Sequence, residues 1–329
     1  MVLVTGGTGL VGAHLLIHLL EKGENVRAIY RNSDSINKTK SLFSLYKKDA
    51  LFESIQWIQA DIVDIPALEN VFQEVDQVYH CAAMISFDPN DEDLVRKTNI
   101  EGTANIVNFC LANNIKKLCH VSSIAALGDL PEHESIITEE TEWNPEKPHS
   151  DYAISKYGAE MEIWRAQQEG LQVVIINPGV IMGPGFWEQG SGELFNKVKN
   201  GLPFYTKGST GFIAVSDVVS VMYQLMKSSI QGERYTLISQ NIIFKDLLFS
   251  IADALKVKRP NYHATPFVMN TLSKFDWIAS NLFGQKRQLS KASARSSYSN
   301  DLYSSEKIKN ALNITFQDVH HYIKEITNL

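Results

Sequence analysis

The N-terminal stretch Thr5-Gly6-Gly7-Thr8-Gly9-Leu10-Val11-Gly12 decides the fold, because its glycines stand between an apolar run (2–5) and a helical pattern (10–21). At such a junction the first glycine permits a tight turn, the second lets the backbone approach a pyrophosphate, and the third lets the helix pack on the strand. The helix N-terminus adds free N–H groups and partial positive charge. Alone, such glycines can mark only a tight turn, but this context predicts a dinucleotide site. Its contacts would be Gly6, Thr8, Gly9, Leu10, Val11 and Gly12.

Short β-branched runs alternate with longer helical patterns along the first half of the chain. The expected strands are residues 2–5, 26–30, 55–58, 78–80, 118–121 and 173–176, and the expected helices include residues 10–21, 91–112 and 152–168. Helices of this length can cross over between parallel strands and cover both faces of a sheet. The pattern therefore predicts an α/β fold with a doubly wound parallel sheet of the Rossmann type.

The local composition changes after residue 176, where frequent glycine and proline residues indicate loops. Residues 212–215 and the helix-like 216–226 are interpreted as a return to the sheet layer. We expect a dinucleotide-binding domain of residues 1–182 plus 212–238. A smaller, mainly helical substrate lobe is expected from residues 183–211 plus 239–329, with 290–305 as its most mobile stretch.

Composition restricts the class of protein. The 329 residues are 44% hydrophobic and 21% charged, which suits one large domain or two smaller ones, and the net charge of −6 makes nucleic acid a poor partner. Cys81, Cys110 and Cys119 lack metal-ligand spacing, so no metal is expected and the thiols are interpreted as buried and reduced. The N-terminus has no signal-peptide pattern, and every apolar run is shorter than the roughly 18 residues of a membrane span. We expect a cytoplasmic protein without a membrane partner.

Arg31 bears on the choice of cofactor. About 20 residues beyond the glycines an NAD site offers a carboxylate to the ribose 2′-OH, whereas this chain has Arg31 with Asn32 and Ser33 beside it. Such donors suit a 2′-phosphate, so NADP(H) is favoured and NAD(H) remains possible. The alternatives are a solvated surface arginine, or Asp34 in the carboxylate role if the second strand ends later.

Two further positions follow expected strands. Asp61, after the third strand, can meet the adenine amine or serve only as a turn residue. Cys81-Ala82-Ala83, after the fourth strand, are small residues that let a cofactor lie against the backbone or that reflect helix–sheet packing. For each position the sequence leaves both explanations open.

A second group of residues carries the candidate proton chemistry. Tyr152 and Lys156 lie at i and i+4 of one expected helix. A cation about 4 Å from a phenol is worth roughly 4 kcal/mol at an effective dielectric near 20, or about three pKa units, so Lys156 is expected to lower the pKa of Tyr152. Ser123 ends the fifth strand and can bind a substrate oxygen, with Ser122 as its competitor on the opposite face. Asn99, in a helical run, is a further candidate for the catalytic group. It is interpreted as holding a structural water or breaking the helix locally, or else as an ordinary polar residue at the surface.

These motifs together resemble the extended short-chain dehydrogenase/reductase family, which includes NAD-dependent epimerases and dehydratases. They are T-G-x-x-G-x-x-G at 5–12, N-x-x-G-T at 99–103, S-S at 122–123, Y-x-x-x-K at 152–156 and P-G-x-x-x-G-P-G at 178–185. The resemblance implies catalytic Ser123, Tyr152 as general acid or base, and Lys156 bound to the nicotinamide ribose. We also expect Ile62, Pro178 and Val180 among the cofactor contacts. Residues 212–219 and 232–238 look most like the dihydroflavonol-reductase and 3β-hydroxysteroid-dehydrogenase branch.

Three functions are carried forward. The first is an NADP-dependent oxidoreductase acting on a secondary alcohol or ketone, as a monomer or homodimer. Its medium-sized, apolar substrate would meet some of Phe186, Trp187, Phe195, Phe204, Phe212 and Trp277. The second is a redox-neutral nucleotide-sugar epimerase or dehydratase. It is weakened by Asn177 and Ala214, where many such enzymes have Arg and His, although Arg287, Lys291 and Arg295 can meet a diphosphate. The third is a non-catalytic dinucleotide sensor.

Overall fold

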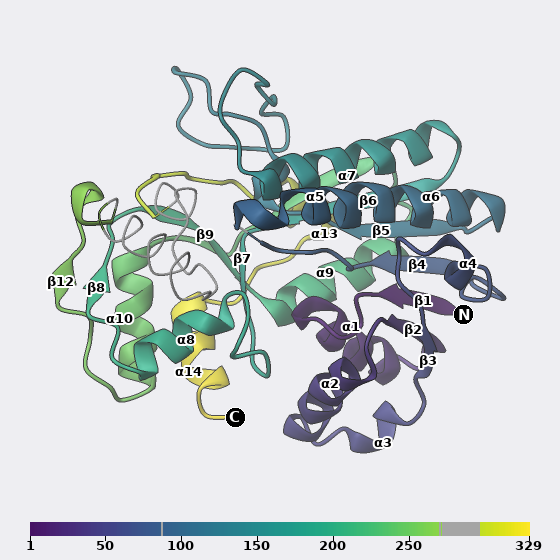
Figure 1. Ribbon diagram of the computed structural model, residues 1–329, viewed down its shortest axis with the longest axis horizontal. Helices are drawn as coiled ribbons and strands as arrows, with labels where there is room; N and C mark the ends of the chain where they lie inside the picture. The colour runs from purple at the N-terminus through teal and green to yellow at the C-terminus, as the bar shows by residue number, and fades with distance from the viewer. Residues whose placement is uncertain (87, 270, 272–296) are drawn as a thin grey trace.

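The computed structural model describes residues 1–86, 88–269, 271 and 297–329 (Figure 1). Its main sheet has seven parallel strands in the order β10-β6-β5-β4-β1-β2-β3. These strands are β1 Val2–Thr5, β2 Val26–Tyr30, β3 Gln56–Gln59, β4 Gln77–His80, β5 Lys117–Val121, β6 Gln172–Pro178 and β10 Glu233–Leu237. The predicted doubly wound α/β fold is confirmed.

Helices cover both faces of this sheet. One face carries α1 Leu10–Glu21, α2 Ser33–Leu45, α3 Asp49–Phe52 and α9 Val215–Lys227; the other carries α5 Glu92–Arg96, α6 Gly102–Ala112 and α7 Asp151–Gln168 (Figure 1). The short helix α4 Ile65–Leu68 follows β3. Each face has its own apolar core: Leu16 and Val218 lie in the first, and Val107 and Ile163 lie in the second. The central strands β1, β4, β5 and β6 are therefore buried on both sides, whereas the edge strand β3 is partly exposed.

Smaller elements make up the rest of the described chain. Strands β7 Val180–Met182, β9 Ser209–Ala214 and β11 Gln240–Ile243 form a three-stranded sheet, and β8 Phe204–Tyr205 pairs with β12 Tyr262–His263. The helices are α8 Gly192–Lys199, α10 Phe244–Ala254, α13 Glu306–Leu312 and α14 Val319–Ile326. Short 3₁₀ turns are η1 Pro89–Asp91 and η3 Ile124–Ala126, and η2 Lys97–Glu101 is a π-helical segment.

One expectation about the chain path was wrong. Residues 212–215 do not rejoin the main sheet, because β9 pairs with β7 and β11 instead. The return is made by α9, which packs against α1, and by β10, the seventh strand. The run Phe212-Ile213-Ala214 is buried on both sides, and an apolar run of this kind does not indicate which sheet it joins. The division into two domains stays a prediction, and part of the stretch 290–305 lies outside the described residues.

The strand order fixes where a ligand binds. Strand order reverses at β1, which has β2 on one side and β4 on the other. In sheets of this kind ligands bind outside the carboxyl ends of the strands at such a reversal. The loops that follow β1 and β4 therefore form the centre of the candidate site.

Candidate functional site

The three glycines after β1 differ in how closely other protein atoms surround them. Gly6 has φ +69°, and a Cβ there would lie 2.7 Å from the backbone nitrogen of Ala82. At Gly12 a Cβ would lie 2.1 Å from the Gly6 carbonyl oxygen. Gly6 and Gly12 are thus required by the turn and by packing. At Gly9 the nearest protein atom is the Gly6 oxygen at 3.5 Å, an ordinary contact, so the protein itself leaves room there.

The start of α1 fits the pyrophosphate of a dinucleotide. Gly9 is its N-cap and supplies no side-chain hydrogen bond, so the first-turn N–H groups keep their capacity for an acceptor and the helix dipole favours an anion. Thr8, Leu10 and Val11 are half-buried around this turn. The Thr5 hydroxyl accepts from the Ala82 N–H at 3.1 Å, which ties the β1 loop to the β4 loop. The glycine turn and the helix terminus lie together, and their binding of a pyrophosphate stays a prediction.

Arg31 stands at the end of β2 as an exposed side chain. Its guanidinium lies 3.9 Å from Asp61 Oδ2, and the side chain is 66% exposed. The other oxygen of Asp61 accepts from the Val63 N–H at 3.1 Å, so Asp61 does shape the turn after β3. Because β2 ends at Tyr30 and Asp34 lies in the first turn of α2, the condition for a carboxylate role of Asp34 is not met.

The other expected cofactor contacts lie along the same carboxyl edge. Cys81, Ala82 and Ala83 follow β4, Pro178 ends β6 and Val180 begins β7. Ile62 differs from them, because its side chain is buried against Gly102 and its carbonyl accepts from the Asn105 amide at 3.0 Å. Its side chain therefore belongs to the core. The contacts of all these residues with a cofactor stay predictions.

Ser123 and Tyr152 are brought together by a hydrogen bond between their side chains. Ser123 caps the 3₁₀ turn after β5, where its Oγ accepts from the Ala125 N–H at 3.1 Å. Tyr152 lies in the first turn of α7, which Ser150 caps by accepting from the Ala153 N–H at 3.2 Å. Ser122 is buried, and its hydroxyl lies toward Glu160 instead. Of the two serines, Ser123 is the one placed beside the phenol.

The electrostatics of Tyr152 differ from the expectation. Burial raises the pKa of Tyr152 and the Ser123 hydrogen bond only partly offsets that increase, so the expected lowering by Lys156 was wrong. The Lys156 ammonium donates to the Val121 carbonyl at 2.8 Å. Burial lowers the pKa of Lys156 to about 8, against the raising effect of Glu160 and Cys81. Tyr152 consequently keeps its proton at neutral pH, whereas the Lys156 ammonium, with a pKa of about 8, titrates close to neutral pH.

Asn99 breaks its helix, as one interpretation of the sequence required. It lies in the π-helical segment η2 and is buried. Its Nδ2 donates to the Met84 carbonyl at 2.9 Å and to Ser155 Oγ at 2.8 Å, and its Oδ1 accepts from the Met84 N–H at 2.7 Å. The amide therefore clamps the loop after β4 to α7, one residue before Lys156. A direct catalytic role stays a prediction.

A buried polar network beneath the site was missed by the sequence analysis. The Glu160 side chain is 0% exposed, and its carboxylate accepts from Asn177 Nδ2 at 2.5 Å and from Arg234 at 3.3 Å. The same Asn177 Nδ2 donates to the Ser123 carbonyl at 3.0 Å. One signal was present in the sequence, because Glu160 follows Lys156 by four residues and therefore shares its helix face.

Three of the six aromatic residues considered for the substrate wall lie in the core. Phe186, Phe195 and Phe212 are 3%, 3% and 0% exposed and belong to the main apolar cluster, so substrate contact with others of the six stays a prediction. Trp187 and Phe204 are partly exposed, and Trp187 stacks edge-on against Phe195 with centroids 5.1 Å apart. Trp277, Arg287, Lys291 and Arg295 lie outside the described residues.

Comparison with known proteins identifies the family of this chain. The family model for the NAD dependent epimerase/dehydratase family matches residues 2–237. The chain belongs to this family. It is 31% identical over 266 residues to a putative dihydroflavonol 4-reductase of Synechocystis sp., covering 78% of this chain and 73% of that protein. Sterol demethylase protein B of Methylococcus capsulatus is 27% identical over 273 residues, covering 82% of this chain and 79% of that protein.

Solved structures support the fold. The crystal structure of UDP-glucose 4-epimerase with UDP-glucose from Thermotoga maritima has a TM-score of 0.77 at 17% identity, covering 99% of this chain and 97% of that one. The chain therefore belongs to an enzymatic, NAD(P)-binding family. Within the described part of the chain, no helix is long and apolar enough to cross a membrane.

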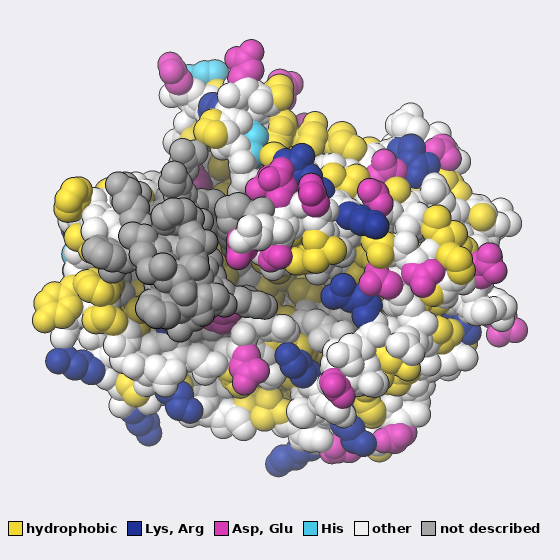
Figure 2. Space-filling model, viewed as in Figure 1, with side chains coloured by type: hydrophobic (Ala, Val, Ile, Leu, Met, Phe, Trp, Pro, Cys, Tyr) yellow, Lys and Arg dark blue, Asp and Glu magenta, His cyan; other side chains and the backbone are white. Residues whose placement is uncertain are grey.

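The described surface carries charges of both signs. Figure 2 shows Lys and Arg side chains interspersed with Asp and Glu over one face of the molecule. Such a mixed surface provides no broad basic field of the kind that attracts a nucleic acid backbone. The absence of a nucleic acid partner, like the oligomeric state, stays a prediction.

Proposed function

We propose that this family member is an NADP-dependent reductase that interconverts a ketone and a secondary alcohol. The observation that carries the proposal is the Ser123–Tyr152 hydrogen bond at the carboxyl edge of the sheet, beside the glycine loop. The pair supports the proposal, because a protonated phenol and a neighbouring hydroxyl can both donate to one substrate oxygen. A general acid within hydrogen-bond reach of the reacting oxygen is what carbonyl reduction requires.

Ser123, Tyr152 and Lys156 have different roles in the proposed reduction. The chemistry supplied by the bound cofactor is hydride transfer between nicotinamide C4 and the carbinol carbon. Ser123 orients the substrate carbonyl oxygen, and Tyr152 donates its phenolic proton to that oxygen as negative charge develops there. Burial raises the pKa of Tyr152, which keeps the phenol protonated before each turnover. Lys156, with a pKa of about 8, can return a proton to the tyrosinate.

Arg31 is the support for NADP(H) over NAD(H). Its exposed guanidinium stands at the end of β2, in the position where an NAD site offers a carboxylate. A guanidinium pairs with a phosphate through charge-assisted hydrogen bonds and cannot serve a ribose diol in the same way.

The substrate is proposed to be a medium-sized apolar carbonyl compound. The support is the similarity to proteins named as a dihydroflavonol 4-reductase and a sterol demethylase protein, together with Asn177 and Ala214 at positions where many sugar-nucleotide enzymes have Arg and His. The resemblance to a UDP-glucose epimerase concerns the fold.

The test is turnover by the purified protein with NADPH or NADH against aromatic ketones, steroid ketones and nucleotide sugars. Net NADPH oxidation with a ketone, and its loss in Tyr152→Phe, is the expected result. Conversion of a nucleotide sugar without net NADPH consumption, with all ketones inert, would replace the proposal by the epimerase or dehydratase alternative. Cofactor binding without any turnover would indicate the non-catalytic sensor.

A further inference from the structure

Glu160 occupies an unusual place for a carboxylate. It lies on α7 one turn after Lys156, fully buried beneath the strand ends that carry Ser123 and Asn177. Burying an ionised carboxylate is costly unless charge and hydrogen bonds compensate for the lost hydration. The side chain of Glu160 must therefore be compensated by specific partners.

Two of those partners bind it directly. Asn177 Nδ2 donates to Glu160 Oε1 at 2.5 Å and also to the Ser123 carbonyl at 3.0 Å, so one amide links the carboxylate to the backbone of the candidate catalytic serine. Arg234 donates to Glu160 Oε2 at 3.3 Å from β10, the strand next to β6. The carboxylate is held from two strands at once.

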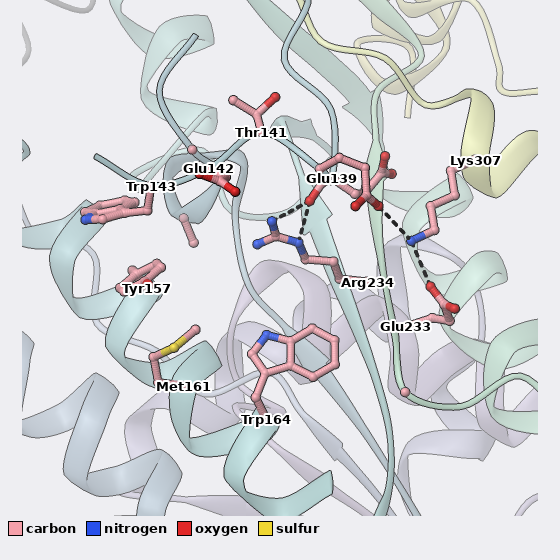
Figure 3. Close-up of a pocket in the computed structure, with 14 residues that line it drawn as sticks. Glu139, Thr141, Glu142, Trp143, Tyr157, Met161, Trp164, Glu233, Arg234 and Lys307 are labelled. Atoms are coloured by element: carbon pink, nitrogen blue, oxygen red, sulfur yellow. Dashed lines mark hydrogen bonds and ion pairs between the residues drawn. The ribbon is translucent and has the colours of Figure 1, made fainter. Parts of the chain in front are cut away.

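Arg234 reaches Glu160 from the wall of a pocket of about 560 Å³ on the outer side of α7. In that wall its Nε donates to the Glu139 carbonyl at 3.0 Å (Figure 3). The side chain of Glu139 also accepts from the Thr236 N–H at 2.6 Å. Figure 3 also shows Lys307 paired with Glu233, 2.7 Å apart, so the cations of this wall are engaged with acceptors. The hydrogen bond to the Glu139 carbonyl thus holds the Arg234 guanidinium in the position from which it donates to Glu160.

We infer that Glu160, clamped by Arg234 and Asn177 and buried one helical turn from the buried Lys156, is a positioning residue that keeps Lys156 charged for the proposed reaction. The ammonium has the Val121 carbonyl as its hydrogen-bond acceptor and Glu160 as the one carboxylate among the described groups that act on its charge. Without Glu160, Lys156 would be a cation in an apolar interior. This inference rests on the proposed function.

The other groups around Lys156 do not replace the carboxylate. His80 and His120 lie on β4 and β5, and burial holds both of their pKa values far below the usual range, so they are neutral. Burial likewise keeps the Cys81 thiol protonated, because it raises the pKa of that thiol well above its usual value. Tyr152 keeps its proton for the same reason. Glu160 is then the counter-charge that holds the pKa of Lys156 near 8 rather than lower.

The decisive variant is Glu160→Gln, which keeps the shape and the Asn177 hydrogen bond but removes the charge. The alkaline limb of kcat for ketone reduction should move down by about one pH unit or more, which is about a fivefold loss of turnover at pH 8 and approaches tenfold at higher pH. The alkaline limb of NADPH affinity, followed by fluorescence, should move in the same direction. Glu160→Asp, which keeps the charge, should lie closer to the wild type.

Two further variants test whether Glu160 acts on Lys156 or only stabilises the fold. Arg234→Met should move the alkaline limbs of kcat and of NADPH affinity to lower pH, by a smaller amount than Glu160→Gln does. The double variant should differ little from Glu160→Gln alone, because Arg234 acts on Lys156 through Glu160. Glu162→Gln is the matched control, since Glu162 lies on the same helix but pairs with Arg165 near the surface at 2.8 Å. Its profile should match the wild type.

The outcomes distinguish this inference from the proposed function. Equal losses of kcat at every pH in Glu160→Gln, with both limbs unmoved, would show a merely structural role and overturn the inference. If Glu160→Gln does not fold, Arg234→Met and Glu160→Asp test the same shift. Full activity of Tyr152→Phe would remove the proposed function, whereas the pH dependence of NADPH affinity would still report on Lys156.

Discussion

The loops after β1 and β2 and the segments after β5 and β6 lie on one edge of one sheet, but they are built from different parts of the chain. The first region offers backbone, at Gly6 to Gly12, and one exposed cation, Arg31. The second offers side chains in a buried setting, with Lys156 3% exposed and Glu160 fully buried. The first region therefore suits binding of an anion that brings its own charge. The second suits proton transfer, because burial adjusts the pKa of each group.

The largest expected effect is in the second region. Tyr152→Phe should lower kcat for ketone reduction by about 10²–10⁴-fold, because it removes the transferable proton and leaves the ring in place. NADPH affinity should stay within a few-fold. Steady-state kinetics and a fluorescence titration measure the two quantities.

Tyr157→Phe is the control for that substitution. Tyr157 lies on the same helix but faces the pocket on its outer side, where its ring stacks on Trp143 with centroids 4.5 Å apart. This variant should keep normal turnover. Near-normal turnover of Tyr152→Phe across neutral pH would remove Tyr152 from its proposed role.

The same contrast explains what could be predicted from the sequence. The glycine loop was correctly placed at a strand–helix junction, because its motif lies within eight consecutive residues between two strongly patterned segments. The positions of Ser123 at the end of a strand and of Tyr152 in the following helix were predicted from the sequence, whereas the hydrogen bond between them was not. The Glu160 network was not predicted, because Asn177 and Arg234 are 17 and 74 residues away from it in the sequence. The pKa of Tyr152 was misjudged for a related reason, since burial is set by the whole fold whereas the i, i+4 spacing is local.

The aromatic residues show a further limit of sequence reasoning. Phe186 and Phe212 follow or flank the loops at the edge of the sheet, and their type suits a pocket as well as a core. Only the packing of α8, β9 and α10 around them decides that they are core residues. The wrong expectation for residues 212–215 has the same cause, because the sheet that a buried strand joins depends on distant partners.

A smaller effect is expected in the first region. Arg31→Ala should weaken NADPH binding by about 10–150-fold and NADH binding much less, because a charge-assisted phosphate contact is worth about 1.5–3 kcal/mol. Loss of the Asp61 pair contributes little, since an exposed ion pair at 3.9 Å is weak. Affinities for both cofactors, measured at one ionic strength, give the ratio.

Lys38→Ala controls for the lost positive charge, because Lys38 is an exposed cation on the neighbouring helix α2. It should leave the ratio of NADPH to NADH affinity unchanged. Equal losses of both cofactors in Arg31→Ala, or a wild-type preference for NADH, would contradict the NADP assignment and leave the rest of the site intact.

The smallest expected effect separates binding from packing within the glycine loop itself. Gly9→Ala should leave the melting temperature unchanged, because the added Cβ would meet only the Gly6 oxygen at 3.5 Å. It should weaken NADPH binding by about tenfold, or ~1.4 kcal/mol, because the methyl group occupies the space where a pyrophosphate would approach the helix N-terminus. Gly12→Ala is the counterpart, since its Cβ would lie 2.1 Å from the Gly6 oxygen and should destabilise the fold. Thermal unfolding and NADPH titration on both variants are the measurements. If Gly9→Ala bound NADPH normally, the backbone of this turn would not be the phosphate site, and Gly6 and Gly12 would be explained by packing alone.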